Sequence, residues 1–428
     1  MSFLSRAALE AEQLARLNIL IAALMPSNAF YAPKLDAAGL GQGVGSLAEF
    51  FARMPLTTKQ QIVDDQREYA PYGSNLTYPI ERYTRFCQTS GTSGFTLRWL
   101  DTTESWEWMV ENWVEVFRTA DVSARDRLFY AFSFGPFLGF WTAFAAGERL
   151  GCLCLPGGGM SSAARLKTIL DNCVTTLCCT PTYAIRLGEV AREEGIDLAT
   201  SAVRRIIVAG EPGAGIPATR ARIEQLWPGV RLYDHHGMTE IGPVSFECPV
   251  CPGVLHVLES RFIAEVLDPE TLQPTLPGER GELVLTNLGR LGSPLLRYRT
   301  GDLVQAGARE ICACGRWDLA LDGGILGRTD DMVVVRGVNL YPSAIEAVLR
   351  QFGEIAEYRV TLTTANALRE AVIELEPLPS CPDPEALRHA AESALRATFH
   401  LRLPTNIVDC GTLPRSEMKA QRWVRTDT

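Results

Sequence analysis

The sequence predicts an α/β protein: a large N-terminal domain with parallel sheets covered by helices and a β-barrel-like subdomain, followed by a small α+β C-terminal domain. Three observations predict this class. Apolar runs alternate with helical stretches through the middle of the chain, as in a parallel sheet covered on both faces. After Cys251 the pattern becomes one of short β-strands, which suggests a barrel-like subdomain. A compact α+β unit of about 100 residues ends the chain, so we expect domains at residues 1–327 and 328–428.

Length and composition agree with a multidomain globular protein. A chain of 428 residues, 46% hydrophobic and 21% charged, predicts two or three domains. The net charge of −9 argues against a general binder of phosphate backbones, so no nucleic-acid partner is expected. The apolar run at residues 17–25 follows acidic residues and is too short to span a bilayer. We therefore expect a cytoplasmic protein without a membrane partner, whose twelve cysteines are mostly reduced.

The first part of the chain, residues 1–102, contains a candidate phosphate site. Residues 1 to about 85 are predicted to be helical and irregular, and the segment 55–59 opens a helix through a Thr cap. The segment 89–94 (Thr-Ser-Gly-Thr-Ser-Gly) follows a short strand-like run. Its hydroxyls and glycines can turn donors toward a phosphate, although the same composition also suits a flexible connection. It is not a Walker motif, because no Gly-Lys-Ser/Thr follows.

The middle of the chain supplies the sheet. The helix predicted at residues 103–119 carries an apolar stripe that belongs to the core. The segment 132–141 is rich in aromatic residues and is either core or the wall of a pocket for a flat apolar substrate. The strands are predicted at 127–133, 152–155, 174–178, 205–209 and 230–233, and the helices between the first of them at 139–150 and 161–172.

The segment 233–240 (Tyr-Asp-His-His-Gly-Met-Thr-Glu) comes at the carboxyl end of the last of these strands. Ligands bind at that end in open α/β sheets. Gly237 permits a tight turn, and the oxygens of Thr239 and Glu240 suit Mg²⁺ on a polyphosphate. The alternative is an ordinary strand-to-loop turn with a capping Thr.

The remaining elements are shorter. Strands of the barrel-like part are predicted at 262–267, 281–286, 296–298 and 303–306. A linker with two acids, 327–331, precedes the strand 332–336. The small domain continues with a helix at 342–352, strands at 357–363 and 370–375, a helix at 384–398 and a strand at 406–410.

Five motifs occur in the order found in acyl-adenylate-forming enzymes: residues 89–94, 236–240, 298–302, 327–337 and 413–419. Together with the segments 55–59 and 337–342, they make the chain resemble the phenylacetate–CoA ligase branch, which includes aryl-CoA ligases acting on benzoate, anthranilate or phenylacetate. This resemblance implies a small C-terminal domain that is mobile, with ATP, Mg²⁺ and coenzyme A as cofactors. The implied reaction makes an acyl-AMP and pyrophosphate, and the thiol of coenzyme A then displaces AMP.

The resemblance also implies roles for individual residues. Lys419 would stabilise the charge that develops during adenylation, with Thr239 at the α-phosphate and Glu240 as the Mg²⁺ ligand. Asp302 would hold both ribose hydroxyls, assisted by Arg328. The phosphate loop would be Thr89, Ser90, Gly91, Thr92, Ser93 and Gly94, and the other nucleotide-binding residues Gly210, Glu211, Pro212, Asp234 and His235. For the second step the small domain would turn at Asp330 and bring Gly337 to the acyl-adenylate, where a glycine leaves room for the pantetheine arm.

The substrate is expected to be a small aryl acid. The residues assigned to its pocket are Phe134, Gly135, Phe140, Ala209, His236, Gly237 and Met238. Two rival functions stay open: an enzyme that loads the acyl group onto a carrier protein, and a non-catalytic acyl- or nucleotide-binding protein. A homodimer is a further open expectation.

The chain departs from the family pattern at two positions. The phenylacetate branch usually has a Lys directly after the last glycine of the phosphate loop, but Phe95 stands there and Arg98 follows three residues later. Arg98 either compensates or points elsewhere. His236 replaces the usual Tyr, and either hydrogen-bonds a substrate substituent or packs.

A set of cysteines and one histidine predicts a zinc site. Thiolates and imidazole suit tetrahedral Zn²⁺. Some relatives in this branch carry a Cys/His/Cys/Cys set that corresponds to Cys248, His256, Cys312 and Cys314, with Cys251 spare or substituting. The predicted zinc is structural, and the alternative is free thiols in two neighbouring loops.

Overall fold

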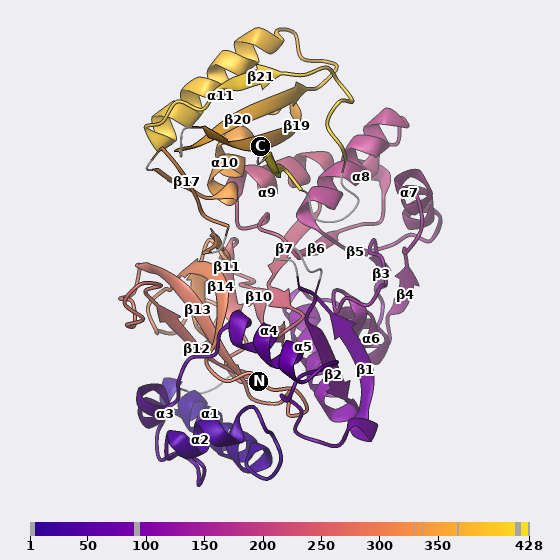
Figure 1. Ribbon diagram of the computed structural model, residues 1–428. Coiled ribbons are helices and arrows are strands. Elements are labelled where there is room, and N and C mark those ends of the chain that lie inside the picture. Colours follow the sequence, from indigo (N-terminus) through magenta and orange to yellow (C-terminus); the bar gives the residue numbers. More distant parts are fainter. Residues whose placement is uncertain are drawn as a thin grey trace.

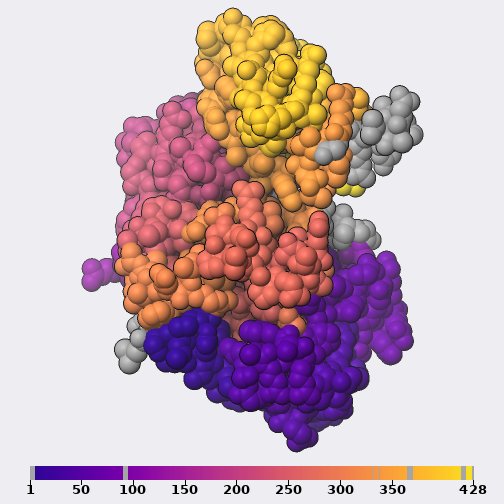
Figure 2. Space-filling view, turned by 90° about the vertical axis from the view of Figure 1, so that its left-hand side faces the viewer, coloured from indigo at the N-terminus to yellow at the C-terminus, as the bar shows by residue number. Residues whose placement is uncertain are grey.

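The computed structural model describes residues 5–89, 95–329, 331–336, 338–365, 368–415 and 421–426. A small α+β unit lies at one end of the molecule and the N-terminal helices at the other, with the sheets between them (Figure 1). The space-filling view shows the small unit seated on the middle of the chain (Figure 2). Among the described residues, no helix combines the length and the apolar character needed to cross a membrane.

The N-terminal region is helical, as predicted. Ser5 caps the first helix by accepting a hydrogen bond from the N–H of Ala8. Thr58 and Gln61 form a capping box at the start of α4, which confirms the predicted Thr cap. The elements of this region are α1 (Arg6–Leu24), α2 (Ala32–Ala37), α3 (Leu47–Arg53), α4 (Lys59–Glu68), the 3₁₀ helix η1 (Ile80–Arg82) and the antiparallel pair β1 (Tyr83–Gln88) and β2 (Arg98–Thr102).

The central sheet has five parallel strands in the order β4-β3-β5-β6-β7. This order confirms the parallel sheet that the alternating pattern predicts. Its strands are β3 (Arg127–Tyr130), β4 (Leu153–Pro156), β5 (Thr176–Cys179), β6 (Arg205–Ala209) and β7 (Arg231–His235). The helix α5 (Thr103–Thr119) precedes these strands, and the helices between them are α6 (Trp141–Arg149), α7 (Ser162–Asp171), α8 (Pro181–Glu193) and α9 (Pro217–Leu226), with a 3₁₀ turn η2 (Leu198–Thr200).

Strand alternation divides the sheet residues between two cores. In β6, Ile207 packs into the cluster that contains α5 and α6, whereas its neighbours Ile206 and Val208 pack into the cluster that contains α7, α8 and α9. Both faces of the sheet are therefore buried, which explains why its strands are continuous apolar runs.

The predicted barrel-like part consists of small antiparallel sheets. One has the order β12-β13-β14-β16, with β12 (Phe262–Leu267), β13 (Arg280–Asn287), β14 (Tyr298–Gln305) and β16 (Gly327–Arg328). A second contains β10 (Ser245–Glu247), β11 (Val254–Val257) and β15 (Ala320–Asp322), and a hairpin joins β8 (Gly237–Met238) to β9 (Gly242–Pro243). The two strands predicted at 296–298 and 303–306 are wrong, because β14 is continuous. The pairing register of β13 with β14 shifts between Glu282 and Val284. This shift accommodates Gly301 of β14, which has a left-handed backbone conformation.

The small C-terminal unit has its own apolar core, built around Ile345, Tyr358, Ile373 and Leu395. Its larger sheet has the order β21-β20-β19-β22, and the last strand is one that the sequence pattern did not predict. The elements are β17 (Val333–Val335), β18 (Val338–Leu340), α10 (Pro342–Leu349), β19 (Ile355–Ala365), β20 (Leu368–Pro377), α11 (Pro384–Phe399), β21 (Thr405–Ile407) and β22 (Trp423–Thr426). The domain boundary between residues 327 and 328 stays a prediction.

Candidate active site

The β8–β9 hairpin carries Thr239 and Glu240 at its tip, directly beyond the carboxyl end of β7. Gly237 was predicted to form a tight turn, and this is wrong, because Gly237 is a strand residue paired with Pro243. The left-handed residue of the hairpin is Gly242, with φ 98°. Gly237 instead allows a close approach, since a Cβ there would lie 3.0 Å from the carbonyl oxygen of Gly242.

Two side chains from distant segments hold this hairpin tip. Arg290 Nη1 donates to the carbonyl oxygens of Thr239 (2.7 Å) and Glu240 (2.9 Å). Asp101 holds the same guanidinium through two hydrogen bonds of 2.6 and 2.7 Å, and both side chains are fully buried. The tip is therefore fixed before any ligand binds.

The carboxylate of Glu240 has a cation beside it. Lys59, in the first turn of α4, places Nζ 3.7 Å from Glu240 Oε1. Arg98 does not take this place, because its Nη1 donates to the carbonyl of Pro71. Lys59 is thus a cation at the hairpin tip, and the sequence indicated it only as part of the segment 55–59.

Asp302, on β14, lies between two partners. Arg328 on the paired strand β16 donates from Nη1 to Oδ1 (3.0 Å), and His236 Nε2 lies 2.9 Å from Oδ2. Burial acts to raise the pKa of Asp302, but His236 and Arg328 outweigh it and hold the pKa below its ordinary value. The carboxylate is therefore an acceptor, and His236 donates to it from Nε2. His236 Nδ1 is buried without a hydrogen-bond partner.

Asp234, one residue before the two histidines, belongs to a buried pair of carboxyl groups. Its backbone N–H donates to Glu247 Oε2, and its own Oδ1 accepts from the N–H of His235 (3.0 Å). Burial, together with the Glu247 carboxylate, raises the pKa of Asp234 to about 7. Arg220 Nη2 lies 2.5 Å from Glu247 Oε1, and this ion pair stabilises the Glu247 carboxylate.

The segment 210–212 follows β6, the strand beside β7, so Ala209 lies opposite His235 in the register of the sheet. Gly210 has a φ of 98°, and Glu211 Oε1 accepts from the N–H of Thr182 at 2.9 Å. Burial raises the pKa of Glu211 above its ordinary value. The structure therefore brings the predicted adenine-flanking segment to the same end of the sheet as the β8–β9 hairpin.

A continuous group of rings, which we call the aromatic wall, packs against the end of β7. The ring of His235 lies 4.1 Å from that of Trp113, and Phe140 lies 5.8 Å from Trp113 and 5.4 Å from Phe132. Phe140 is a core residue at 3% exposure, whereas Phe132 is only partly buried. The segment 132–141 therefore contributes to the core through Phe140, and its alternative role as the wall of a substrate pocket stays a prediction. The aromatic wall consists of Trp113, Phe132, Phe134, Phe140 and His235.

Two other residues assigned to the substrate pocket pack against the same core cluster. Ala209 and Met238 are partly buried against the core cluster that contains Phe140. Gly135 and Gly237 are also partly buried.

Several predicted site residues lie outside the described residues: Ser90, Gly91, Thr92, Ser93, Gly94, Asp330, Gly337 and Lys419. Thr89, the first residue of the predicted phosphate loop, is described. Its hydroxyl accepts a hydrogen bond from the N–H of Leu97 at 3.0 Å, so it closes the base of the connection between β1 and β2.

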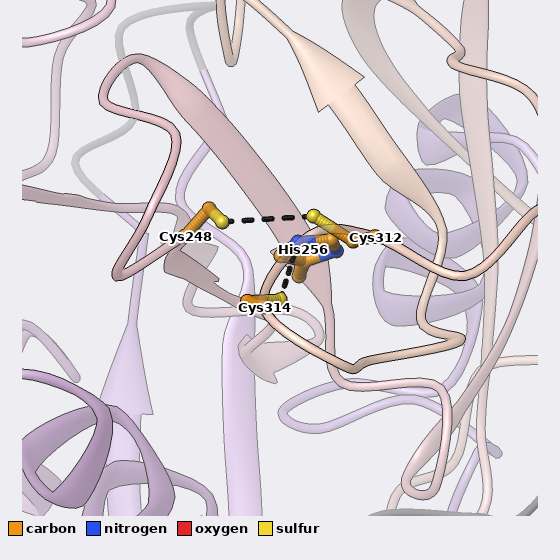
Figure 3. A group of neighbouring side chains, drawn as sticks. All are labelled: Cys248, His256, Cys312 and Cys314. Atoms are coloured by element: carbon orange, nitrogen blue, oxygen red, sulfur yellow. Dashed lines mark hydrogen bonds between the residues drawn. The ribbon is translucent and has the colours of Figure 1, made fainter.

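The predicted zinc residues come together in space (Figure 3). Cys248 follows β10, His256 lies on β11, and Cys312 and Cys314 come from the loop before β15. Their ligand atoms all lie within 4.8 Å of one another. Cys251 is not among these four, although its N–H donates to Cys248 Sγ.

The distances in this cluster fit a tetrahedral site. Bond lengths of about 2.3 Å for Zn–S and 2.0–2.1 Å for Zn–N require S···S separations of about 3.8 Å and S···N separations of about 3.5 Å. Cys248 Sγ lies 3.7 Å from Cys312 Sγ, and Cys314 Sγ lies 3.5 Å from His256 Nε2. His256 Nδ1 donates to the carbonyl of Asp318 (3.0 Å), which leaves the Nε2 lone pair directed at the thiols.

Comparison with known proteins agrees with this geometry. Residues 86–289 match the AMP-binding enzyme family, and residues 337–426 match the AMP-binding enzyme C-terminal domain. The phenylacetate–coenzyme A ligase of Thermus thermophilus is 33% identical over 376 residues, covering 87% of this chain and 82% of that protein. The ligase of the same name from Escherichia coli is 30% identical over 409 residues, covering 92% and 89%.

A solved structure resembles the whole chain. The crystal structure of a 2-hydroxyisobutyryl-CoA ligase in the postadenylation state with 2-HIB-AMP has a TM-score of 0.92 at 26% identity, covering 99% of this chain and 91% of that one. Its complex with 2-HIB-AMP and CoA in the thioesterification state gives 0.74 at 27% identity, covering 100% and 91%.

The fold, the strand-end hairpin and these matches define an adenylate-forming enzyme that acts as an acid–thiol ligase, with ATP and coenzyme A as its partners. The chain belongs to the phenylacetate–coenzyme A ligase branch of that family. The predicted family and fold class are therefore confirmed.

Proposed function

We propose that the chain joins a small aryl carboxylic acid to coenzyme A through an enzyme-bound acyl-AMP. The observation that carries this proposal is the position of two consecutive residues. His235 belongs to the aromatic wall, and His236 contacts Asp302, the proposed ribose-binding acid. An acyl group against the wall would therefore lie one residue away from the nucleotide, as an acyl-adenylate requires. The name of the relatives, phenylacetate–coenzyme A ligase, also favours an aryl acid.

For adenylation, Glu240 and Thr239 offer oxygens for a metal ion and for the α-phosphate. Bound Mg²⁺ would neutralise the charge of the polyphosphate during attack by the carboxylate. Lys59 is well placed to contact the outer phosphates, because its ammonium already lies beside Glu240. Lys419, outside the described residues, is proposed as the second cation, acting on the substrate carboxylate and the α-phosphate.

For the nucleotide, Asp302 is proposed to accept hydrogen bonds from both ribose hydroxyls. Each of its oxygens already accepts one hydrogen bond, from Arg328 or from His236, and a carboxylate oxygen has two lone pairs. The two existing partners therefore orient the carboxylate and keep it ionised, while leaving acceptor capacity for the sugar. Asp234 and the segment 210–212 are proposed to border the adenine.

For the thioester step, the small domain is proposed to turn at Asp330 so that Gly337 approaches the acyl-adenylate. The two TM-scores support this proposal, because one relative matches the chain better in its postadenylation state than in its thioesterification state. Ser343 Oγ, on α10, donates a hydrogen bond to the carbonyl of Leu326, which precedes the proposed hinge in the chain.

The Cys/His cluster is proposed to hold a structural zinc ion. It fastens the loop 312–314 to β10 and β11, and no reacting group is proposed to touch it. A bound ion would supply cross-linking of these segments rather than chemistry.

The test is ATP–pyrophosphate exchange with purified protein and a panel of aryl and alkyl acids, followed by detection of the thioester with and without coenzyme A. Exchange with an aryl acid and a CoA-dependent thioester is the expected result. If exchange occurs without a CoA thioester and the acyl group is found on a phosphopantetheinylated carrier protein, the acceptor would be the carrier protein rather than CoA. Exchange restricted to alkyl acids would overturn the aryl assignment, and no exchange with any acid would overturn the ligase itself.

A further inference from the structure

The hydrogen bond made by the His235 ring fixes which of its two nitrogens carries the hydrogen. Its side chain is 4% exposed, and Nδ1 lies 2.6 Å from the carbonyl oxygen of Ser245. A carbonyl oxygen only accepts, so Nδ1 carries the hydrogen and Nε2 carries the lone pair. Burial lowers the pKa of His235 to about 3, so the ring is neutral and this arrangement persists at neutral pH.

The lone pair at Nε2 is free. Among the described residues no side chain or backbone group donates a hydrogen bond to it, although the ring is buried against Trp113. Unlike His236 Nδ1, which is buried without a partner, His235 Nε2 is not sealed from its surroundings. Water or a ligand group can therefore reach it and donate a hydrogen bond to its lone pair.

The surroundings keep space open beside this nitrogen. A Cβ on Gly237 would lie 3.2 Å from His235 Nε2, so the absence of a side chain at Gly237 leaves the nitrogen uncovered on that side. Trp113 packs on the ring, and Ala209 lies opposite His235 in the sheet. His235 Nε2 is thus an acceptor beside the rings of the aromatic wall.

We propose that His235 Nε2 accepts a hydrogen bond from an O–H or N–H group on the acid substrate, so that the enzyme selects hydroxy- or amino-substituted acids over their unsubstituted analogues. This proposal rests on the proposed function, because it assumes that the acyl group lies against the aromatic wall. It refines that function by naming a substituent class. A fluorine of similar size to a hydroxyl donates no hydrogen bond and would not satisfy the nitrogen.

The test compares matched acids in ATP–pyrophosphate exchange. The probes are benzoate, its three monohydroxy, three monoamino and three monofluoro derivatives, and the aliphatic pair 2-hydroxyisobutyrate and isobutyrate. For at least one donor-bearing acid, kcat/KM is expected to exceed that of both its unsubstituted and its fluorinated analogue by about tenfold or more, which corresponds to about 1.4 kcal/mol.

His235→Phe removes the acceptor and keeps a ring against Trp113. In this variant the preference, taken as the ratio of kcat/KM for the substituted acid to kcat/KM for the unsubstituted acid, is expected to fall to about twofold or less. His389→Phe, at an exposed position on α11, is the matched control and should keep the wild-type preference.

A second measurement does not depend on the variant folding. Sulfamoyl-adenosine analogues of benzoic acid and of the preferred substituted acid are compared by calorimetry on the wild-type protein, and the donor-bearing analogue should bind about tenfold more tightly. Equal use of substituted and unsubstituted acids by the wild type, or an unchanged preference in His235→Phe, would overturn the proposal and leave the ligase assignment intact. Absence of exchange with every acid would instead count against the proposed function.

Discussion

Replacing Asp234 by Asn should stabilise the ligand-free protein, and by more at alkaline than at acidic pH. Asp234 is 8% exposed and lies beside the Glu247 carboxylate, so ionising it places two negative charges in a poorly hydrated site. Asn keeps the oxygen that accepts from the N–H of His235 and removes the charge. The substitution therefore tests the electrostatics of the site with little change of shape.

The magnitude follows from linkage. Folding raises the pKa of Asp234 from 3.8 to about 7. The folded state therefore binds more protons than the unfolded state between these two values. Stability falls as the pH rises through this window, and the loss is complete above pH 7. A tenfold change in proton affinity is worth about 1.4 kcal/mol, so the full cost of ionisation is on the order of 4 kcal/mol.

The assay is thermal unfolding without nucleotide at several pH values. About 3 kcal/mol of the cost accrues between about pH 5 and about pH 8. For a domain of this size, 1 kcal/mol shifts Tm by roughly 1–2 °C. The difference in Tm between Asp234→Asn and wild type should therefore be about 3–6 °C larger at pH 8 than at pH 5.

Asp409→Asn, at an exposed position, is the matched control and should show no such pH-dependent gain. A Tm difference between Asp234→Asn and wild type that stays constant across the pH range would refute the reasoning, because only ionisation of Asp234 makes the gain depend on pH.

Three further outcomes follow from the site. Lys59→Met should lower the rate of pyrophosphate exchange by about 10²-fold, and Lys167→Met, whose side chain is 75% exposed, should not. The purified protein should contain about one zinc ion per chain by atomic emission. Cys314→Ser should lose the ion and unfold at a lower temperature, whereas the exposed Cys173→Ser should retain it. Asp302→Asn should weaken AMP binding by calorimetry about tenfold or more, since a neutral amide is a poorer acceptor for the ribose; unchanged affinity would remove Asp302 from the nucleotide site.

The features that the sequence predicted well are those set by local pattern. Continuous apolar runs such as 205–209 belong to strands buried on both faces, and alternation with helices implies parallel pairing. The zinc residues were predicted from chemistry and family pattern together, because thiols and imidazole are uncommon neighbours without a metal. The continuous β14 was not predicted, since the register shift that accommodates Gly301 depends on the partner strand.

The features that the sequence did not predict depend on contacts between distant residues. Lys59 and Glu240 are far apart in the chain, and nothing near Lys59 indicates that α4 would bring it to the hairpin tip. Arg290 and Asp101 form a fully buried pair between segments 189 residues apart. Only Nε2 of His235 is free, because Nδ1 donates to the backbone carbonyl of Ser245, and the sequence does not show this contact. Each of these follows from tertiary packing rather than from local propensity.

In the proposed function, one strand end serves two ligands through His235 and His236. Successive side chains along an extended chain point to opposite sides, so His235 meets Trp113 of α5 while His236 meets Asp302 of β14. In His235 the backbone of Ser245 occupies Nδ1 and leaves Nε2 open, whereas in His236 Asp302 occupies Nε2 and leaves Nδ1 open. The same residue type therefore offers an acceptor toward the aromatic wall and a donor toward the carboxylate of Asp302. Recognition of the acid and of the nucleotide can then vary independently, although the two residues are adjacent.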